Sequence, residues 1–298
     1  MAIDFKIRST VLSNGRKAFY GRVVNSNEQE FLIGYQTKYE DRFGLYNTTE
    51  IQGLKYNPVE YADQFGFYAH FIFPTVQAES KSSLMCLNTY DRARFTFGFM
   101  QFAAHVPNGD FVKYLRDLLG LPNAVEYFPR LRLINDRIHY QNDNSNPFQL
   151  EFDNSTEELM KYLNPGSSDI EHQETICSAR MIHWVKNDPL HRKVQIEAGV
   201  NLYKNNMIRY HNRFNLQGFP AKVCLLICDI LHQGRGTFDR ISYAIDTKGN
   251  YQRAYNNLCR IGEANYKERI NTIKSAISNL ERQGIFNKVY DSGSNTFM

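Results

Sequence analysis

Short β-compatible runs alternate with turn signals over the first 50 residues of the chain. The β-compatible runs cover residues 5–11, 18–24 and 31–35, and they are separated by Ser-Asn-Gly at 13–15 and Asn-Ser-Asn at 25–27. This alternation is typical of strands joined by tight turns. We therefore expect residues 1–55 to form a small N-terminal β-rich region that precedes the main domain.

From residue 58 onwards the apolar positions recur at three- and four-residue steps, which indicates helix. Pro74 lies inside this pattern and predicts a kink or a break near Phe73. The pattern places Glu79 in the last turn of the helical stretch. The apolar positions are Tyr61, Phe65, Tyr68, Phe71, Ile72 and Val76.

The second half of the chain is also predicted to be largely helical. Residues 218–233 leave almost no polar face, so they are expected to form a central buried helix. Residues 264–283 carry isoleucine and leucine on one stripe, with Gly284 as the expected C-cap. The predicted fold class is mainly α (α+β), with residues 56–298 as one mainly helical domain that contains a small β-hairpin.

Composition and charge limit the classes of function. Of the 298 residues, 42% are hydrophobic, which is enough for a sizeable core. The 35 basic and 31 acidic residues give a net charge of +4, too weak to indicate nucleic acid by itself. The pI of about 8.7 suits an anionic polymer better than a cationic one. We expect no nucleic-acid partner.

Cofactor and metal motifs are absent from the sequence. The eight histidines include no His-Glu-x-x-His, and the five cysteines show no finger spacing and are expected to be reduced. No run approaches the roughly 18 apolar residues of a membrane span. The N-terminus has no basic leader or apolar segment, so we expect synthesis in the cytoplasm without a signal peptide. We expect no cofactor, no metal and no membrane span.

Two carboxylates and a threonine carry the clearest chemistry. Glu79 ends an apolar helix, Asp91 follows twelve residues later in a polar turn, and Thr96 stands five residues beyond it. Glycosidic cleavage needs a protonated acid and an ionised carboxylate. Apolar neighbours favour Glu79 as the acid, Asp91 is the expected base, and the Thr96 hydroxyl is expected to hold the attacking water.

This order of residues resembles the lysozyme-like superfamily, in which a helix-terminal glutamate precedes a hairpin that bears aspartate and threonine. Asp91, Thr96, Gly98 and Phe102 are similar to the chitosanase pattern. The segment 97–101, Phe-Gly-Phe-Met-Gln, resembles Phe-Gly-Leu-Met-Gln of goose-type lysozymes, and phage lysozymes share the order of acid, aspartate and threonine. The resemblance implies a lysozyme-like helical fold and an inverting glycoside hydrolase.

Four further residues of this stretch are candidates for binding substrate. Gln101 would line the sugar groove, or its amide would satisfy backbone groups in the hairpin. Tyr90 and Phe99 would stack on sugar rings, although most aromatic residues here are expected to pack in the core. His105 is either a third polar group of the site or an ordinary structural histidine.

The leading hypothesis is a muramidase that cleaves the β-1,4 backbone of bacterial peptidoglycan. A chitosanase-like hydrolase is the enzymatic alternative, and a non-catalytic lysozyme-like module of a phage particle or secretion apparatus is the alternative from another class. A wall hydrolase without a signal peptide would reach its polysaccharide after lysis or injection. Its expected partners include an immunity protein or the injection machinery.

Overall fold

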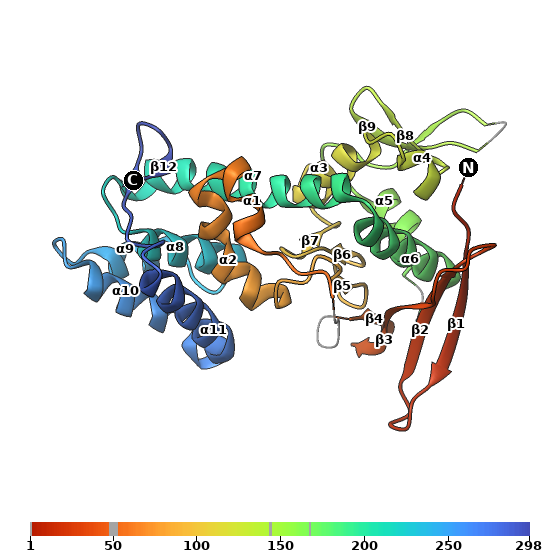
Figure 1. Cartoon of the computed structure of the whole chain (residues 1–298), viewed down its shortest axis with the longest axis horizontal. Coiled ribbons are helices and arrows are strands. Elements are labelled where there is room, and N and C mark those ends of the chain that lie inside the picture. The colour runs from red at the N-terminus through yellow and green to blue at the C-terminus, as the bar shows by residue number, and fades with distance from the viewer. Residues whose placement is uncertain (1, 48–52, 143–144, 167) are drawn as a thin grey trace. The chain divides into compact units, whose positions relative to one another are not determined.

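The computed structural model describes residues 2–47, 53–142, 145–166 and 168–298 of the chain (Figure 1). The chain divides into two compact units. Unit 1 comprises Met1–Lys55 and Ser83–Ala198, and unit 2 comprises Tyr56–Ser82 and Gly199–Met298. The division predicted at residue 55 is therefore only one of the boundaries, because residues 83–198 group with the N-terminal strands.

Unit 1 is built on a seven-stranded sheet in which all neighbouring strands are antiparallel and follow chain order. Tyr46 of the fourth strand pairs with Asn88 of the fifth, and Asn88 pairs with Thr96 of the sixth, so the sheet of the N-terminal hairpins extends to the strand that bears Thr96. The strands are β1 (Phe5–Val11), β2 (Lys17–Val23), β3 (Phe31–Tyr39), β4 (Arg42–Tyr46), β5 (Leu87–Asn88), β6 (Thr96–Phe97) and β7 (Phe102–Ala103).

The prediction of a mainly helical, lysozyme-like fold is wrong. The expected β-hairpin is part of the large antiparallel sheet, and unit 1 also contains a three-stranded sheet in the order β10-β9-β8. The prediction failed because it treated the N-terminal strands as a separate region. Their hydrogen-bonded pairing continues into residues 87–103. The strands of the second sheet are β8 (Leu131–Ile134), β9 (Arg137–Tyr140) and β10 (Phe148–Gln149).

Helices pack against the sheet in unit 1. α6 contacts β1 and β3, and its buried Trp184 stacks on Tyr127 with ring centroids 4.9 Å apart. Burial of such large aromatic rings dominates the energy of a core. The helices are α3 (Asp110–Leu119), α4 (Ala124–Tyr127), α5 (Glu157–Leu163) and α6 (His172–Asn187), and α7 (Pro189–Phe214) contributes residues to both units.

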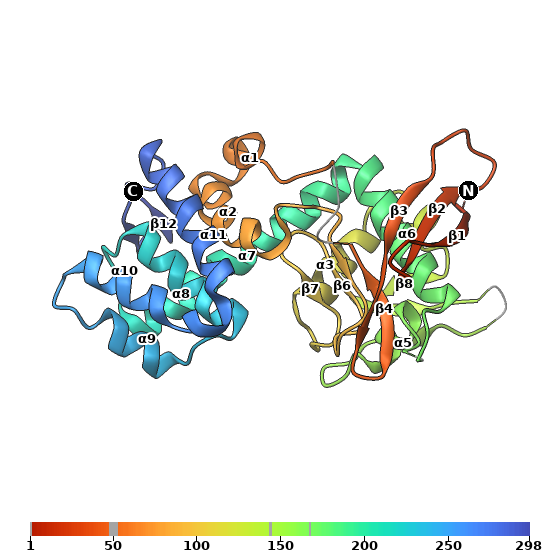
Figure 2. The ribbon, with the colours of Figure 1, turned by 90° about the horizontal axis from the view of Figure 1, so that it is seen from below.

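Unit 2 is predominantly helical (Figure 2). Gly66, at φ +60°, separates α1 from α2, so the break lies there, and α2 runs on through Pro74. The predicted central helix is confirmed, since α8 is buried along most of its length and contacts α2 and α10. The elements are α1 (Pro58–Phe65), α2 (Phe67–Ser80), α8 (Ala221–Gln233), α9 (Phe238–Ile245), α10 (Tyr251–Arg260), α11 (Glu263–Arg282), β11 (Tyr290–Asp291) and β12 (Thr296–Phe297).

Candidate active site

Glu79 lies in the last turn of α2, as the sequence predicts. Its side chain is 18% exposed, and its Oε2 accepts a hydrogen bond from Nη1 of Arg269 on α11. The helices α2 and α11 are in contact within unit 2. The carboxylate is therefore held in one place by a cation from the neighbouring helix, while part of it reaches solvent.

Arg269 also binds a second carboxylate. Its Nη2 donates to Oδ1 of Asp229 at 2.8 Å, and Oδ2 of Asp229 accepts from Arg235 at 3.1 Å and 3.3 Å. These four residues, Glu79, Arg269, Asp229 and Arg235, are called the Glu79 network below. Burial alone would lower the pKa of Arg269, but the charges of Glu79 and Asp229 raise it above its ordinary value.

The side chains of the Glu79 network differ in their exposure to solvent. The side chains of Asp229 and Arg235 are 0% exposed and that of Arg269 is 10% exposed, so Glu79 is the member nearest to solvent. Two guanidiniums face two carboxylates in this network. Because the charge of Arg269 is shared with Asp229, only part of it acts on Glu79.

Asp91 lies in unit 1, in the turn between β5 and β6. Its Oδ1 accepts from the amide of Ala93 and its Oδ2 from Nδ2 of Asn88, both at 2.8 Å. The backbone carbonyl of Asp91 accepts from Arg42. The side chain borders a basin of about 360 Å³, which Arg42 also lines. Asp91 thus closes a turn and retains free lone pairs on both oxygens.

Thr96 is the first residue of β6 and is 5% exposed. It pairs with Asn88 on one side and Ala103 on the other, in the middle of the β5-β6-β7 ladder. The hydroxyl expected to hold water therefore has little contact with solvent within unit 1.

The four predicted substrate-binding residues have different environments in unit 1. Phe99 is 0% exposed, and its backbone amide donates to the Gln195 side chain at 3.0 Å, so its ring belongs to the core. Gln101 donates to the carbonyl of Gly98 at 3.0 Å, which is the backbone role that the sequence left open. Tyr90 is half-buried near Tyr46, and His105 is exposed.

Glu79 and Asp91 belong to different units, and the structure describes each carboxylate within its own unit. Their pairing in one catalytic site stays a prediction. The two carboxylates have different hydrogen-bond partners in the structure. Glu79 accepts from a guanidinium, and Asp91 accepts from amide N–H groups.

Sequence reasoning missed Arg269 and Arg235 as partners of Glu79. One signal was available in Asp229, which is a carboxylate in a helix with almost no polar face. A fully buried aspartate requires a cation or several donors nearby. Nothing in the sequence indicated which of the 35 basic residues would supply it.

Among the residues that the structure describes, no group of three or more His, Cys, Asp or Glu side chains could hold a metal ion. All five cysteines are buried. Within the same residues, no helix is both long enough and apolar enough to span a membrane. No protein-family model, curated protein or solved structure matches the chain.

Proposed function

We propose that the protein is a glycan hydrolase that cleaves the β-1,4 bonds of peptidoglycan, with Glu79 as general acid and Asp91 as general base. The observation that supports this proposal best is the Glu79 network. The network holds the carboxylate of Glu79 in a partly exposed position at the end of a helix. The buried side chains behind it, Arg269, Asp229 and Arg235, are hydrogen-bonded to one another. Precise positioning of this kind is what a proton donor requires.

Arg269 has a defined chemical role in this proposal. In the reactive form Glu79 carries a proton, which it gives to the oxygen of the leaving sugar as the glycosidic bond breaks. The carboxylate that remains is stabilised by Arg269, whose guanidinium already contacts its Oε2. The interaction is stronger after proton transfer than before it, so it favours the transition state over the resting acid.

Asp91 is suited to activating water. Its two accepted hydrogen bonds hold the carboxylate in a fixed orientation. For inversion, the two carboxyls must lie roughly 6.5 to 9.5 Å apart when substrate is bound, which leaves room for one water molecule.

A non-catalytic binding module is the second candidate function, and a specific observation favours it. Glu79 neutralises a largely buried guanidinium and Asp91 closes a turn, so each carboxylate also has a structural role that needs no substrate. Both candidates place the protein at the cell wall after lysis or injection, where an immunity protein would protect the producing cell.

The test measures release of reducing ends from purified peptidoglycan by the wild type, Glu79→Gln and Asp91→Asn. Loss of an acid or base should lower the rate by about 10²- to 10⁴-fold. Glu268→Gln is the matched control, because Glu268 is an exposed residue of α11 outside the Glu79 network. Circular dichroism confirms that each variant is folded at the assay temperature.

The outcomes separate the alternatives. An unchanged rate in Glu79→Gln contradicts the assignment of the acid. Turnover of chitosan with none of peptidoglycan identifies a chitosanase-like enzyme. Binding of peptidoglycan by the wild type without release of reducing ends identifies the non-catalytic module.

A further inference from the structure

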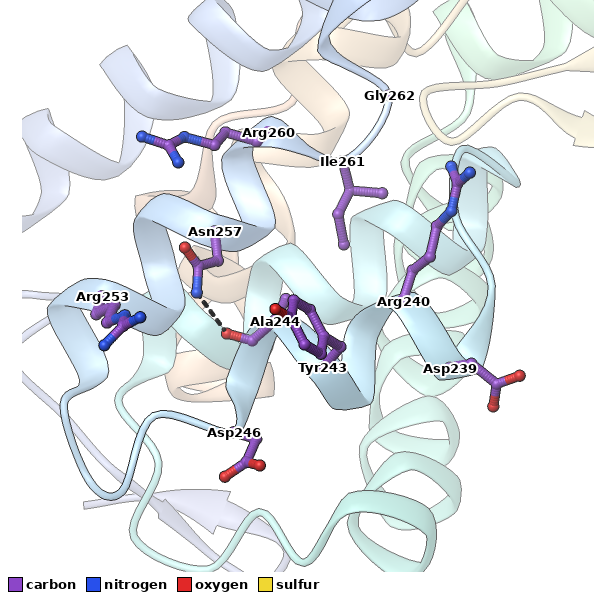
Figure 3. Close-up of a pocket in the computed structure, with 10 residues that line it drawn as sticks. All are labelled: Asp239, Arg240, Tyr243, Ala244, Asp246, Arg253, Asn257, Arg260, Ile261 and Gly262. Carbon is purple, nitrogen blue, oxygen red and sulfur yellow. Dashed lines mark hydrogen bonds between the residues drawn. The ribbon is translucent and has the colours of Figure 1, made fainter.

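A basin of about 770 Å³ lies in unit 2 on α9, α10 and the residues that lead into α11 (Figure 3). It is separate from the side chain of Glu79, which does not line it. The residues around it are Asp239, Arg240, Tyr243, Ala244, Asp246, Arg253, Asn257, Arg260, Ile261 and Gly262.

Three arginines surround the basin. Arg253 and Arg260 stand seven residues apart on α10, so helical geometry places them on one face, and Arg240 comes from α9. All three are exposed, and none forms an ion pair with any residue that the structure describes. Their guanidiniums are therefore available to an anionic ligand, for which planar, two-pronged hydrogen bonding suits a carboxylate.

An aromatic ring lies between these cations. Tyr243, on α9, is 85% exposed, and Figure 3 shows it between Arg240 on one side and Arg253 on the other. A flat exposed ring flanked by hydrogen-bond donors can stack on the apolar face of a sugar while the donors bind its substituents. The ring and the arginines together fit a charged sugar better than a small inorganic anion.

Two carboxylates also line the basin. Asp239 and Asp246 lie at its lower edge in Figure 3 and offset two of the three positive charges. They are suitable acceptors for sugar hydroxyls, whereas they would repel the closely spaced phosphates of a nucleic acid. The chemistry of the lining therefore favours a glycan with isolated negative charges.

The lining of the basin is connected to the Glu79 network through Ile261. The carbonyl of Ile261 accepts from Nη1 of Arg235, which also binds Asp229. The contact is close, because a Cβ on Gly262 would lie 3.1 Å from the Cβ of Arg235 and one on Gly236 would lie 2.6 Å from Ile261. The basin and Glu79 thus rest on one tightly packed part of unit 2.

We propose that this basin binds a carboxylate-bearing segment of a glycan chain. The identification of that glycan as peptidoglycan rests on the proposed function. The basin holds the polymer through the three arginines and Tyr243, on the same unit that positions Glu79. Its contribution is to affinity for the charged polymer, with no part in the bond-breaking step.

The experiment measures binding of soluble, uncrosslinked peptidoglycan strands to the full chain in the Glu79→Gln background, so that the ligand is not cleaved. We expect replacement of Arg240, Arg253 and Arg260 by alanine to weaken binding by at least about tenfold, given the strength of charge-assisted hydrogen bonds. Tyr243→Ala should weaken binding by a smaller factor. Strands whose carboxyl groups are methyl-esterified should bind the parent and the triple variant with equal affinity.

A charge-matched control distinguishes specific binding in the basin from non-specific electrostatic attraction to the protein surface. Lys113, Lys193 and Lys267 are exposed and lie outside the basin, and their joint replacement by alanine removes the same charge. We expect this variant to bind within about twofold of the parent. Equal weakening by both triple variants, or undiminished binding to the esterified strands, would overturn the proposal.

The two proposals fail in different ways. If the wild type releases no reducing ends but loses affinity when the three arginines are replaced, the hydrolase is rejected and the basin is retained. If the wild type cleaves peptidoglycan and the arginine variant binds as its parent does, the basin is rejected and the hydrolase is retained.

Discussion

Arg269 donates to Asp229 across 2.8 Å, and through this contact a side chain of α11 is held against the buried helix α8. The same guanidinium reaches Glu79 on α2, so one residue connects three helices of unit 2. The buried Nε of Arg269 has no hydrogen-bond partner in the described part of the chain, which makes its two carboxylate contacts the main compensation for its burial.

The first prediction concerns the stability of unit 2. Asp229→Asn removes the carboxylate that both Arg269 and Arg235 contact, and Glu79 remains to pair with Arg269 alone. Breaking a buried ion pair costs about 3–5 kcal/mol. We expect a loss of this size in the free energy of unfolding, measured by urea denaturation with far-ultraviolet circular dichroism. Glu79→Gln should cost less, because Glu79 is the most exposed member. An equal loss of unfolding free energy in the two variants would show that the contribution of each carboxylate to stability does not depend on its burial.

The second prediction concerns the pH dependence of unit 1. Burial raises the pKa of Glu174 from 4.5 to about 7, because desolvation disfavours the charged form. Between these two values the unfolded chain releases the proton while the folded chain retains it. Stability is therefore lost as the pH rises from about 4.5 to about 7 and is constant above that, a change of about 3 kcal/mol.

Glu174→Gln isolates this effect because glutamine does not titrate. We expect the free energy of unfolding of the variant, relative to wild type, to increase by about 3 kcal/mol between pH 4 and pH 8. Trp184 is the only tryptophan and is buried in unit 1, so its fluorescence reports unfolding of that unit. A difference that stays constant over this range would show that Glu174 is ionised in the folded chain.

Local patterns in the sequence predicted two helices of unit 2 closely. The stripe of apolar residues over 264–283 corresponds to α11, and the apolar run at 218–233 corresponds to α8. Helical periodicity could be detected there because it depends only on residues close together in the sequence. Strands β5, β6 and β7 have two residues each, and such short strands carry no periodicity. The pairing of Tyr46 with Asn88 is long-range, so the sheet that joins them was not predicted.

The candidate site shows the same limit. The position of Glu79 at a helix end followed from local pattern, and the structure agrees. Its partner Arg269 is 190 residues away, and no spacing rule connects the two. The sequence alone also could not distinguish the core role of Phe99 from sugar stacking, because both uses favour an aromatic residue in a strand-rich segment.

The third prediction concerns the cysteines. All five are buried, and burial raises the pKa of the Cys177 thiol to about 12. Because the thiolate is the reactive form, we expect almost no labelling of the native protein by a thiol-exchange reagent at pH 8 within minutes, and five labelled thiols in guanidinium chloride. Reducing agent should leave the unfolding midpoint unchanged. Rapid labelling of one thiol in the native state would contradict the packing described for that residue.

The fourth prediction tests the turn that precedes Phe99. Gly98 has a φ of +89°, and an added Cβ would lie 2.9 Å from the side-chain Cδ of Gln195. Gln195 is fully buried and binds the amide of Phe99, the carbonyl of Leu84 and the hydroxyl of Tyr114, so it has little freedom to move. We expect Gly98→Ala to lower the free energy of unfolding by about 3 kcal/mol, through backbone strain and displacement of this amide.

Gly15→Ala is the matched control for the strain. Gly15 has a similar φ of +80°, and a Cβ there would meet no atom within 4 Å. This variant should lose only the backbone contribution, about 1 kcal/mol. The difference between the two variants, measured by Trp184 fluorescence in urea, then gives the energy of the contact with Gln195. If both variants lose the same amount, Gln195 adapts to the methyl group and is not the rigid support of the 95–102 segment.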